Sequence, residues 1–271
     1  MATTTTHGDA VEHAGQGYSG NALGAFQIYQ PVGERSSGSG SRTLEWLRAN
    51  AELAADLIAL ITCLVIYAAL ETAKPHLTFL ITSQLYLYSY PLLGQTVPAW
   101  VVPPIAFLIP VAVFWAQTAH RGRPRADVGH LVLSLGIAML MTGAVTNCLK
   151  LAFSRPRPNF VAACWPSDAT PVLGGKWANS FGGLPQCSAP FKQYNEHIKS
   201  FPSGHSSMSA AGLGFLTWYL LGQLKTYSGG GFAWRVVLSF LPALVAIAIG
   251  ITRVTDYWHH PSDVMTGLAL G

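Results

Sequence analysis

Three short polar clusters interrupt an apolar chain, and their residue types are those that phosphate chemistry requires. They are Lys150 with Arg157-Pro158, Pro202-Ser203-Gly204-His205, and Arg253 with His259 and Asp263. Together they offer three fixed cations, two imidazoles and one carboxylate. The planar guanidinium of arginine can donate hydrogen bonds to two phosphate oxygens at once, and lysine adds a point charge. The clusters therefore predict a phosphate-binding site, if the fold brings them together.

Each of the basic and small residues also has a simpler interpretation. Lysine and arginine at the ends of membrane spans commonly reach to the interface as anchors, which would account for Lys150, Arg157 and Arg253. Ser203 and Gly204 come just before an apolar stretch, where serine is a preferred helix cap. The same position offers free backbone N–H groups and the positive end of a helix dipole, which together bind anions.

His205 and His259 supply the remaining chemistry. Phosphoryl transfer needs a nucleophile and a proton for the leaving alkoxide. One neutral imidazole can attack phosphorus while the other, protonated, donates, and Asp263 is near enough in sequence to His259 to fix its ring tautomer. Alternatively, both rings bond to loop backbone, and Asp263 is the N-terminal charge of a helix that starts at Pro261. The residues alone leave open which histidine attacks.

A metal centre is the rival interpretation of the same residues. Zinc takes histidine and aspartate ligands, and such groups are available at His205, His259, His260 and Asp263. Three nearby cations would repel Zn²⁺, however, and no loop offers the paired carboxylates that hold Mg²⁺ at a phosphate. We therefore predict a site that uses neither a metal nor another cofactor.

The elements that position the clusters are apolar stretches at bilayer length, about 20 helical residues each. They cover residues 53–70, 100–117, 131–153, 206–221 and 236–251, and a sixth begins near Pro261 and stops at Gly271. Residues 77–93 are fairly apolar, but their polar and tyrosine residues suit an interface, so we expect a loop there. The sequence predicts an all-α, polytopic membrane helical bundle with six transmembrane helices, the last one truncated.

Composition supports this class of protein. Half of the 271 residues are hydrophobic and 10% are charged, whereas a soluble domain carries about 25% charged residues. Residues 1–45 are rich in Thr, Gly and Ser and should form a disordered segment, followed by a membrane domain over residues 46–271. The formal net charge is only +4 and no basic tail is present, so we expect no nucleic-acid partner.

Basic residues in the short connections predict the orientation, because they concentrate on the cytoplasmic side. They fall on one side if the six stretches alternate: Arg42, Arg48, Arg121, Arg123, Arg125, Lys225 and Arg235. The N-terminus is then cytoplasmic, and all three polar clusters lie together on the lumenal or extracellular side. Cys164 and Cys187 share one loop on that side, either as a disulfide or as two free thiols.

In their order and spacing, the three clusters resemble the signature of the type 2 phosphatidic acid phosphatase superfamily. The surrounding residues 150–158, 199–205 and 256–260 are similar to its eukaryotic six-span branch, the lipid phosphate phosphatases. The resemblance implies that Lys150, Arg157 and Arg253 bind phosphate and that Ser203 and Gly204 complete the cradle. It also implies that His205 is the general acid and that His259 is the nucleophile, oriented by Asp263. Thr252 stands where many members have serine, and it keeps the hydroxyl.

The activity that this resemblance implies is metal-independent hydrolysis of lipid phosphate monoesters through a phosphohistidine. Its substrate classes are phosphatidic acid, lysophosphatidic acid, diacylglycerol pyrophosphate and sphingoid phosphates, and the partners are this lipid and the bilayer. Two alternatives remain open: a non-catalytic lipid-binding membrane protein, and a head-group phosphotransferase that uses the same site. The sequence leaves the oligomeric state undetermined.

Overall fold

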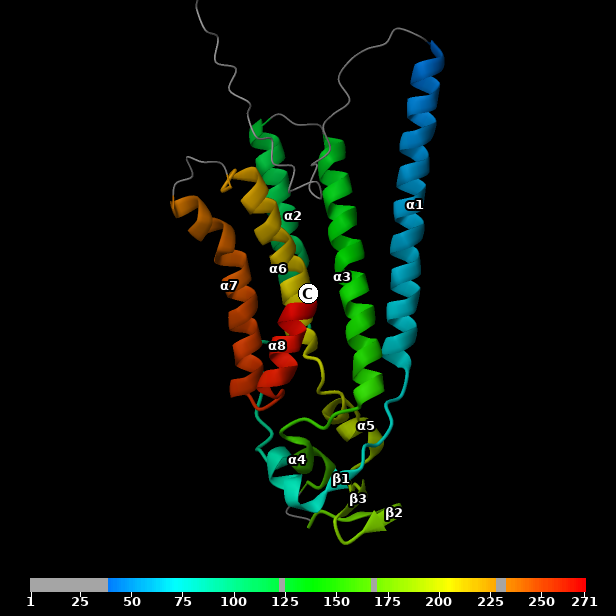
Figure 1. Ribbon diagram of the computed structural model, residues 1–271, viewed down its shortest axis with the longest axis vertical. Coiled ribbons are helices and arrows are strands. Elements are labelled where there is room, and N and C mark those ends of the chain that lie inside the picture. Colours follow the sequence, from blue (N-terminus) through cyan, green and yellow to red (C-terminus); the bar gives the residue numbers. More distant parts are fainter. Residues whose placement is uncertain (1–38, 122–124, 167–169, 228–232) are drawn as a thin grey trace, which may run out of the picture. The chain divides into compact units, whose positions relative to one another are not determined.

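All six predicted apolar stretches form helices in the computed structural model, which describes residues 39–121, 125–166, 170–227 and 233–271 (Figure 1). They are α1 (Ser39–Thr72), α2 (Val102–Arg121), α3 (Arg125–Phe153), α6 (Gly204–Gln223), α7 (Ala233–Thr255) and α8 (Pro261–Leu270). The predicted polytopic membrane bundle of helices is therefore confirmed. The chain divides into two compact units, residues 1–47 and 48–271, and the second unit contains all three polar clusters.

The expected disorder of residues 1–45 stays a prediction, because residues 1–38 lie outside the described part of the chain. Helix α1 already begins at Ser39, before the domain boundary expected at residue 46.

Within the described residues, four helices are long and apolar enough to cross a membrane. They are Asn50–Thr72, Val102–His120, Val128–Phe153 and Ala233–Thr255. Helix α8 has only 10 described residues, and α6 begins with a polar, serine-rich turn. The hydroxyls of α6 are buried rather than exposed to lipid: Ser207 Oγ accepts from Thr146 Oγ1 at 2.9 Å, and Ser209 Oγ donates to the carbonyl of Ser206.

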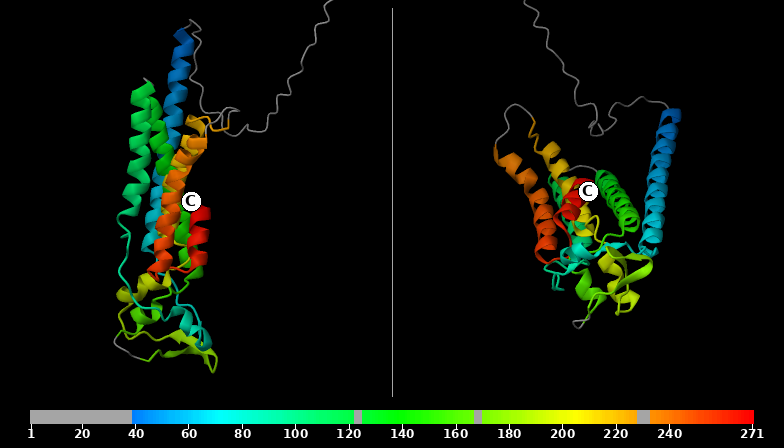
Figure 2. Two further views of the ribbon diagram at one scale, coloured as in Figure 1. Left: turned by 90° about the vertical axis from the view of Figure 1, so that its left-hand side faces the viewer. Right: turned by 60° about the horizontal axis from the view of Figure 1, so that its bottom comes forward.

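Helix α6 has its polar residues covered because it is the central helix of this unit. It packs against α2, α3, α7 and α8, and Figure 2 shows α8 beside α6 and α7 from two further directions. Small residues permit these close contacts, as is common between membrane helices. A side chain at Gly212 would collide with the carbonyl of Ala106 on α2, and one at Gly267 would meet the carbonyl of Ser203.

A folded cap, made of residues 74–99, 154–166 and 170–203, lies where α3 ends and α6 begins (Figure 1). It contains the short helices α4 (Phe160–Cys164) and α5 (Phe191–Tyr194), the 3-10 helices Thr82–Tyr88 and Asn195–Ile198, and three strands. The strands β1 (Leu80–Ile81), β3 (Gly182–Pro185) and β2 (Leu173–Asn179) form an antiparallel sheet in that order. Residues 74–99 thus contain no long helix, as predicted.

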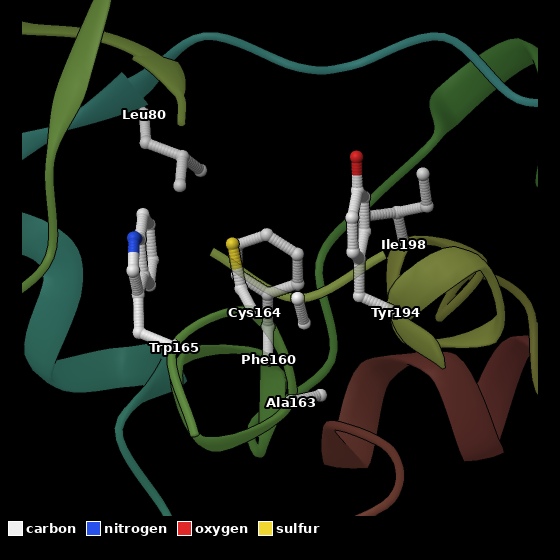
Figure 3. Packing of buried hydrophobic residues seen from close by; sticks show 8 residues of the cluster. Leu80, Phe160, Ala163, Cys164, Trp165, Tyr194 and Ile198 are labelled. Carbon is white, nitrogen blue, oxygen red and sulfur yellow. The ribbon is translucent and has the colours of Figure 1, made fainter. Parts of the chain in front are cut away.

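The cap has its own hydrophobic core and its own covalent link. Figure 3 shows Leu80, Trp165, Phe160, Tyr194 and Ile198 gathered around Cys164. Cys164 forms a disulfide with Cys187, with 4.7 Å between the two Cα atoms, which settles the alternative that the sequence left open. Next to the disulfide, Trp165 Nε1 donates a hydrogen bond to the carbonyl of Gln186. This core fixes the two chain segments that carry the first and second polar clusters.

We predict that Cys164→Ser/Cys187→Ser lowers the melting temperature of the detergent-solubilised protein, measured by tryptophan fluorescence. A cross-link between residues 23 positions apart is worth roughly 3 kcal/mol, because it restricts the unfolded chain. The matched control is Cys63→Ser/Cys148→Ser, which removes the two free cysteines and should melt like the wild type. Equal melting of the two double variants would contradict a structural role for this disulfide.

Candidate active site

The three polar clusters meet at the ends of α3, α7 and the beginnings of α6 and α8. A Cβ atom at Gly204 would lie 3.1 Å from Lys150 Nζ, so the lysine ammonium reaches the first turn of α6. Ser203 caps this helix, its side chain accepting from Ser206 N, and its own N–H donates to the carbonyl of Asp263 at 3.0 Å. The second cluster therefore contacts both of the others.

Arg157 presents its guanidinium inside the site. The side chain is buried, its Cζ lies 4.9 Å above the Trp258 ring, and Nη2 is 4.0 Å from Glu196 Oε2. Burial lowers the pKa of Arg157 to about 10, with Glu196 and Asp263 acting in the opposite direction, so the group stays cationic at neutral pH. Among the described residues, Nε has no hydrogen-bond partner although it is buried. A buried donor without a partner is costly, and a bound anion would satisfy it.

Arg253 is entirely buried and is held by two acceptors. Nη2 donates to Asp256 Oδ2 at 2.8 Å, and both Nε and Nη2 lie within 3.1 Å of Thr252 Oγ1. The hydroxyl oxygen of Thr252 thus accepts hydrogen bonds from the arginine. Asp256 in turn accepts from the N–H and the hydroxyl of Thr96, at 2.8 and 2.7 Å. Neither Asp256 nor Thr96 belongs to the three polar clusters.

His205 faces the same guanidinium. Its Nε2 lies 3.4 Å from Arg253 Nη1 and 3.2 Å from the carbonyl oxygen of Val97. The Val97 carbonyl belongs to the segment that Thr96 and Asp256 hold in place. The position of the His205 ring therefore depends on a loop that precedes α2, which residue types alone did not indicate.

His259 is buried, and its ring is oriented by a backbone carbonyl. Nδ1 lies 2.7 Å from the oxygen of Ser200, so it carries the proton and donates, which leaves the lone pair on Nε2. Burial lowers the pKa of His259 to about 3, and the cations of Arg157 and Lys150 add to this, while Asp263 opposes it. The ring is therefore neutral at physiological pH, as a nucleophile must be.

Asp263 lies beside this ring without being its closest partner. Its Oδ2 is 3.7 Å from His259 Nδ1, farther than the Ser200 carbonyl. The sequence interpretation, in which the aspartate fixes the tautomer, therefore needs a second residue that it did not identify. Ser200 had no special residue type or spacing that would have indicated it.

Two further groups border the site. Lys199 is buried and donates to Glu196 Oε1 at 3.0 Å, next to Lys150 and Arg157. The His260 Nε2 atom lies 3.3 Å from the carbonyl oxygen of Pro156, and the His260 ring makes a T-shaped contact with the Tyr88 ring. In the part of the chain that the structure describes, no three His, Cys, Asp or Glu side chains gather in a way that could hold a metal ion.

The arrangement can neutralise a phosphate dianion, attack it with one imidazole and place a second imidazole beside an arginine. Residues 131–271 match the family described as the PAP2 superfamily. The chain is 36% identical over 223 residues to "Probable lipid phosphate phosphatase 4" of Arabidopsis thaliana, which covers 80% of this chain and 68% of that protein.

Two other relatives extend the comparison. "Lipid phosphate phosphatase 1" of the same plant is 37% identical over 80% of this chain and 64% of its own length. "Diacylglycerol pyrophosphate phosphatase 1" of Saccharomyces cerevisiae is 36% identical over 54% of this chain and 52% of its own length. No solved structure matches the chain.

The role of the Asp256–Arg253 ion pair can be tested by measuring the binding of inorganic phosphate. We expect Asp256→Asn to weaken phosphate binding about tenfold, because a charge-assisted hydrogen bond that positions the guanidinium is worth roughly 1.5–3 kcal/mol. Binding is measured by the concentration dependence of thermal stabilisation.

The matched variant is Glu196→Gln, which removes a carboxylate that competes with phosphate for Lys199 and Arg157. It should bind phosphate at least as tightly as the wild type. If both variants lost affinity equally, the two carboxylates would not have the distinct roles that their contacts indicate.

Proposed function

Because this chain belongs to the PAP2 superfamily, we propose that it hydrolyses phosphate monoesters carried by lipids, with His259 as the nucleophile. The observation that carries the proposal is the state of His259: a buried, neutral ring whose Nδ1–H is engaged by Ser200 and whose Nε2 keeps its lone pair. The cations of Arg157 and Lys150 face that ring. Such preorganised charge is what stabilises a phosphoryl-transfer transition state.

The reaction proceeds in two displacements. Nε2 of His259 forms a bond to phosphorus as the ester P–O bond breaks, and the bonding electron pair goes to the leaving oxygen. Burial and the Arg253 cation lower the pKa of His205 to about 4, so in this proposal the ring takes up a proton from solvent when the phosphate dianion offsets that cation. His205 then gives this proton to the leaving oxygen, and the lipid alcohol departs. His205 then takes a proton from water, whose oxygen attacks phosphorus and breaks the P–N bond, releasing inorganic phosphate and restoring both rings.

Each phosphate ligand has an assigned part in this scheme. Lys150, Arg157 and Arg253 offset the charge on the equatorial oxygens, and the backbone at Ser203 and Gly204 completes the cradle at the start of α6. In this proposal no metal or other cofactor takes part, because the cations of the chain supply the positive charge. Activity should therefore persist in EDTA.

The lipid nature of the substrate is supported by where the site lies. Lys150 and Arg253 stand at the ends of α3 and α7, two of the helices that are long and apolar enough to cross a bilayer. A phosphate head group can enter at the membrane surface while its acyl chains stay among the lipids. The names of the relatives specify lipid phosphates and diacylglycerol pyrophosphate, and these are the substrate classes that we propose here.

We predict different outcomes for the two histidines. His259→Ala should be inactive on both phosphatidic acid and p-nitrophenyl phosphate, because it removes the nucleophile. His205→Ala should retain relatively more activity on p-nitrophenyl phosphate, whose leaving group needs no proton, since general-acid help is worth about 10²–10⁴-fold. Released phosphate is measured with EDTA present throughout.

Rapid acid-labile labelling from ³²P-substrate should appear in the wild type and be absent in His259→Ala. A label that persists in this variant would refute the assignment of the nucleophile. Adding an alcohol acceptor to the same assay distinguishes hydrolysis from transfer, and a completely inactive wild type would favour the non-catalytic alternative.

The proposal includes an orientation, with the N-terminus in the cytoplasm and the site on the lumenal or extracellular side. Basic residues at the opposite helix ends support it, and so does the Cys164–Cys187 disulfide, because disulfides persist in oxidising compartments.

We predict that single cysteines at His120 and Trp177 are labelled from opposite sides of the membrane. Both positions are exposed, and the background is Cys63→Ser/Cys148→Ser, which keeps the cap disulfide. In sealed vesicles of known orientation, an impermeant maleimide should reach only one of them before permeabilisation. Labelling of both from the same side would reject the proposed topology.

A further inference from the structure

The Asp263 carboxylate is held more firmly than contact with His259 alone would explain. Its side chain is completely buried. Arg155 Nη1 donates to Oδ1 at 2.6 Å, while Ser200 Oγ and the N–H of His260 donate to Oδ2 at 2.6 and 3.0 Å. Donors from three separate segments of the chain therefore fix both oxygens.

Ser200 connects this carboxylate to the imidazole. Its hydroxyl donates to Asp263, while its carbonyl accepts the Nδ1–H of His259 at 2.7 Å. Its own N–H donates to the carbonyl of Arg155 at 2.9 Å. Arg155 and Ser200 are thus joined through their backbones, and both reach the same carboxylate with their side chains.

We propose that Arg155 and Ser200 are positioning residues for His259, which hold the Asp263 carboxylate beside the ring and share its negative charge. This inference rests on the proposed function and assigns two residues to which the polar clusters gave no role. Neither side chain needs to touch the substrate. Their contribution passes through Asp263 and through the Ser200 carbonyl to the nucleophile.

The chemistry of the nucleophile explains why the charge of Asp263 has to be shared. His259 must be neutral to attack, yet its ring becomes cationic once the P–N bond forms. The cations of Lys150 and Arg157 and the anion of Asp263 all act on this ring. The Asp263 carboxylate is in turn contacted by Arg155 and by the N–H of His260. A fully uncompensated carboxylate would draw a proton onto the ring before attack. A carboxylate paired with Arg155 does so less, and it remains close enough to stabilise the phosphohistidine.

The direction of the pH effect depends on this arrangement. The pKa of His259 is lowered to about 3, first by burial. Removing the Arg155 cation leaves more of the Asp263 charge to act on the ring, so the pKa of His259 rises. Activity is lost as pH falls through that pKa, and the loss should therefore begin at higher pH in the variant.

The test is the pH profile of kcat/KM for Arg155→Gln. We expect its acid limb to move up by about one pH unit, the lower end of the shift that a neighbouring charge produces. Arg155→Lys, which keeps the cation, should restore the limb most of the way. Lys192→Gln is the matched control, because it removes an exposed cation from the same cap, and it should leave the profile unchanged.

Ser200→Ala gives a second test, which stands even if the arginine variants fold poorly. It keeps the carbonyl and loses the hydroxyl, whose strong contact is the 2.6 Å donation to Asp263 Oδ2 and which lies 3.5 Å from His259 Nδ1. Because the contact with Asp263 is the shorter one, the acid limb should shift in the same direction. Activity that falls equally at all pH values in both Arg155→Gln and Ser200→Ala would show a merely structural role and overturn the proposal.

A readout without activity separates this inference from the proposed function. The ¹³Cε1 resonance of His259, assigned by its absence in His259→Ala, should titrate at higher pH in Arg155→Gln than in the wild type. An unchanged titration overturns the positioning role, even if lipid phosphate hydrolysis is observed. A wild type without hydrolysis overturns the proposed function, even if the titration shifts.

Discussion

The burial of positive charge at the end of a membrane bundle is the constraint on which the rest of this structure depends. Arg253 is completely buried, and Arg157 and Lys199 are 7% exposed. Removing such groups from water costs several kcal/mol each unless partners compensate. The carboxylates of Asp256, Glu196 and Asp263 supply part of the compensation. In the proposed function, the remainder is supplied by the phosphate group of the substrate.

This constraint also explains the cap. Carboxylates and carbonyls can face buried cations only if the segments that carry them are held against the helix ends. The cap obtains that rigidity from a small hydrophobic core and one disulfide. Glu196, Lys199 and Ser200 belong to the cap and lie at the site. The serine-rich start of α6 is covered on several sides by other helices. The hydroxyls of Ser207 and Ser209 have partners inside the protein, whereas among the described residues Ser206 Oγ is buried without one.

The helices, and the three clusters that meet at their ends, could be predicted from sequence because their signals are local. A bilayer demands long apolar stretches, and the cation and imidazole positions lie in three compact motifs. The secondary contacts carry no such signal. Ser200 acts on His259 through a carbonyl, which every residue possesses. Thr96 and Asp256 are 160 positions apart. Two cysteines in one loop did not reveal the 4.7 Å between their Cα atoms.

The position of Asp263 along the chain has a consequence for the biogenesis of the protein. This residue and His259 are synthesised after the cap and after α6, yet they hold the first and second clusters together through Arg155, Ser200 and the N–H of Ser203. Chains generally fold from the N-terminus as they emerge from the ribosome. A nascent chain thus contains α1, α2, α3, α6 and α7 before it contains His259, the nucleophile of the proposed function. In that proposal, catalysis begins only after all of these helices have been synthesised.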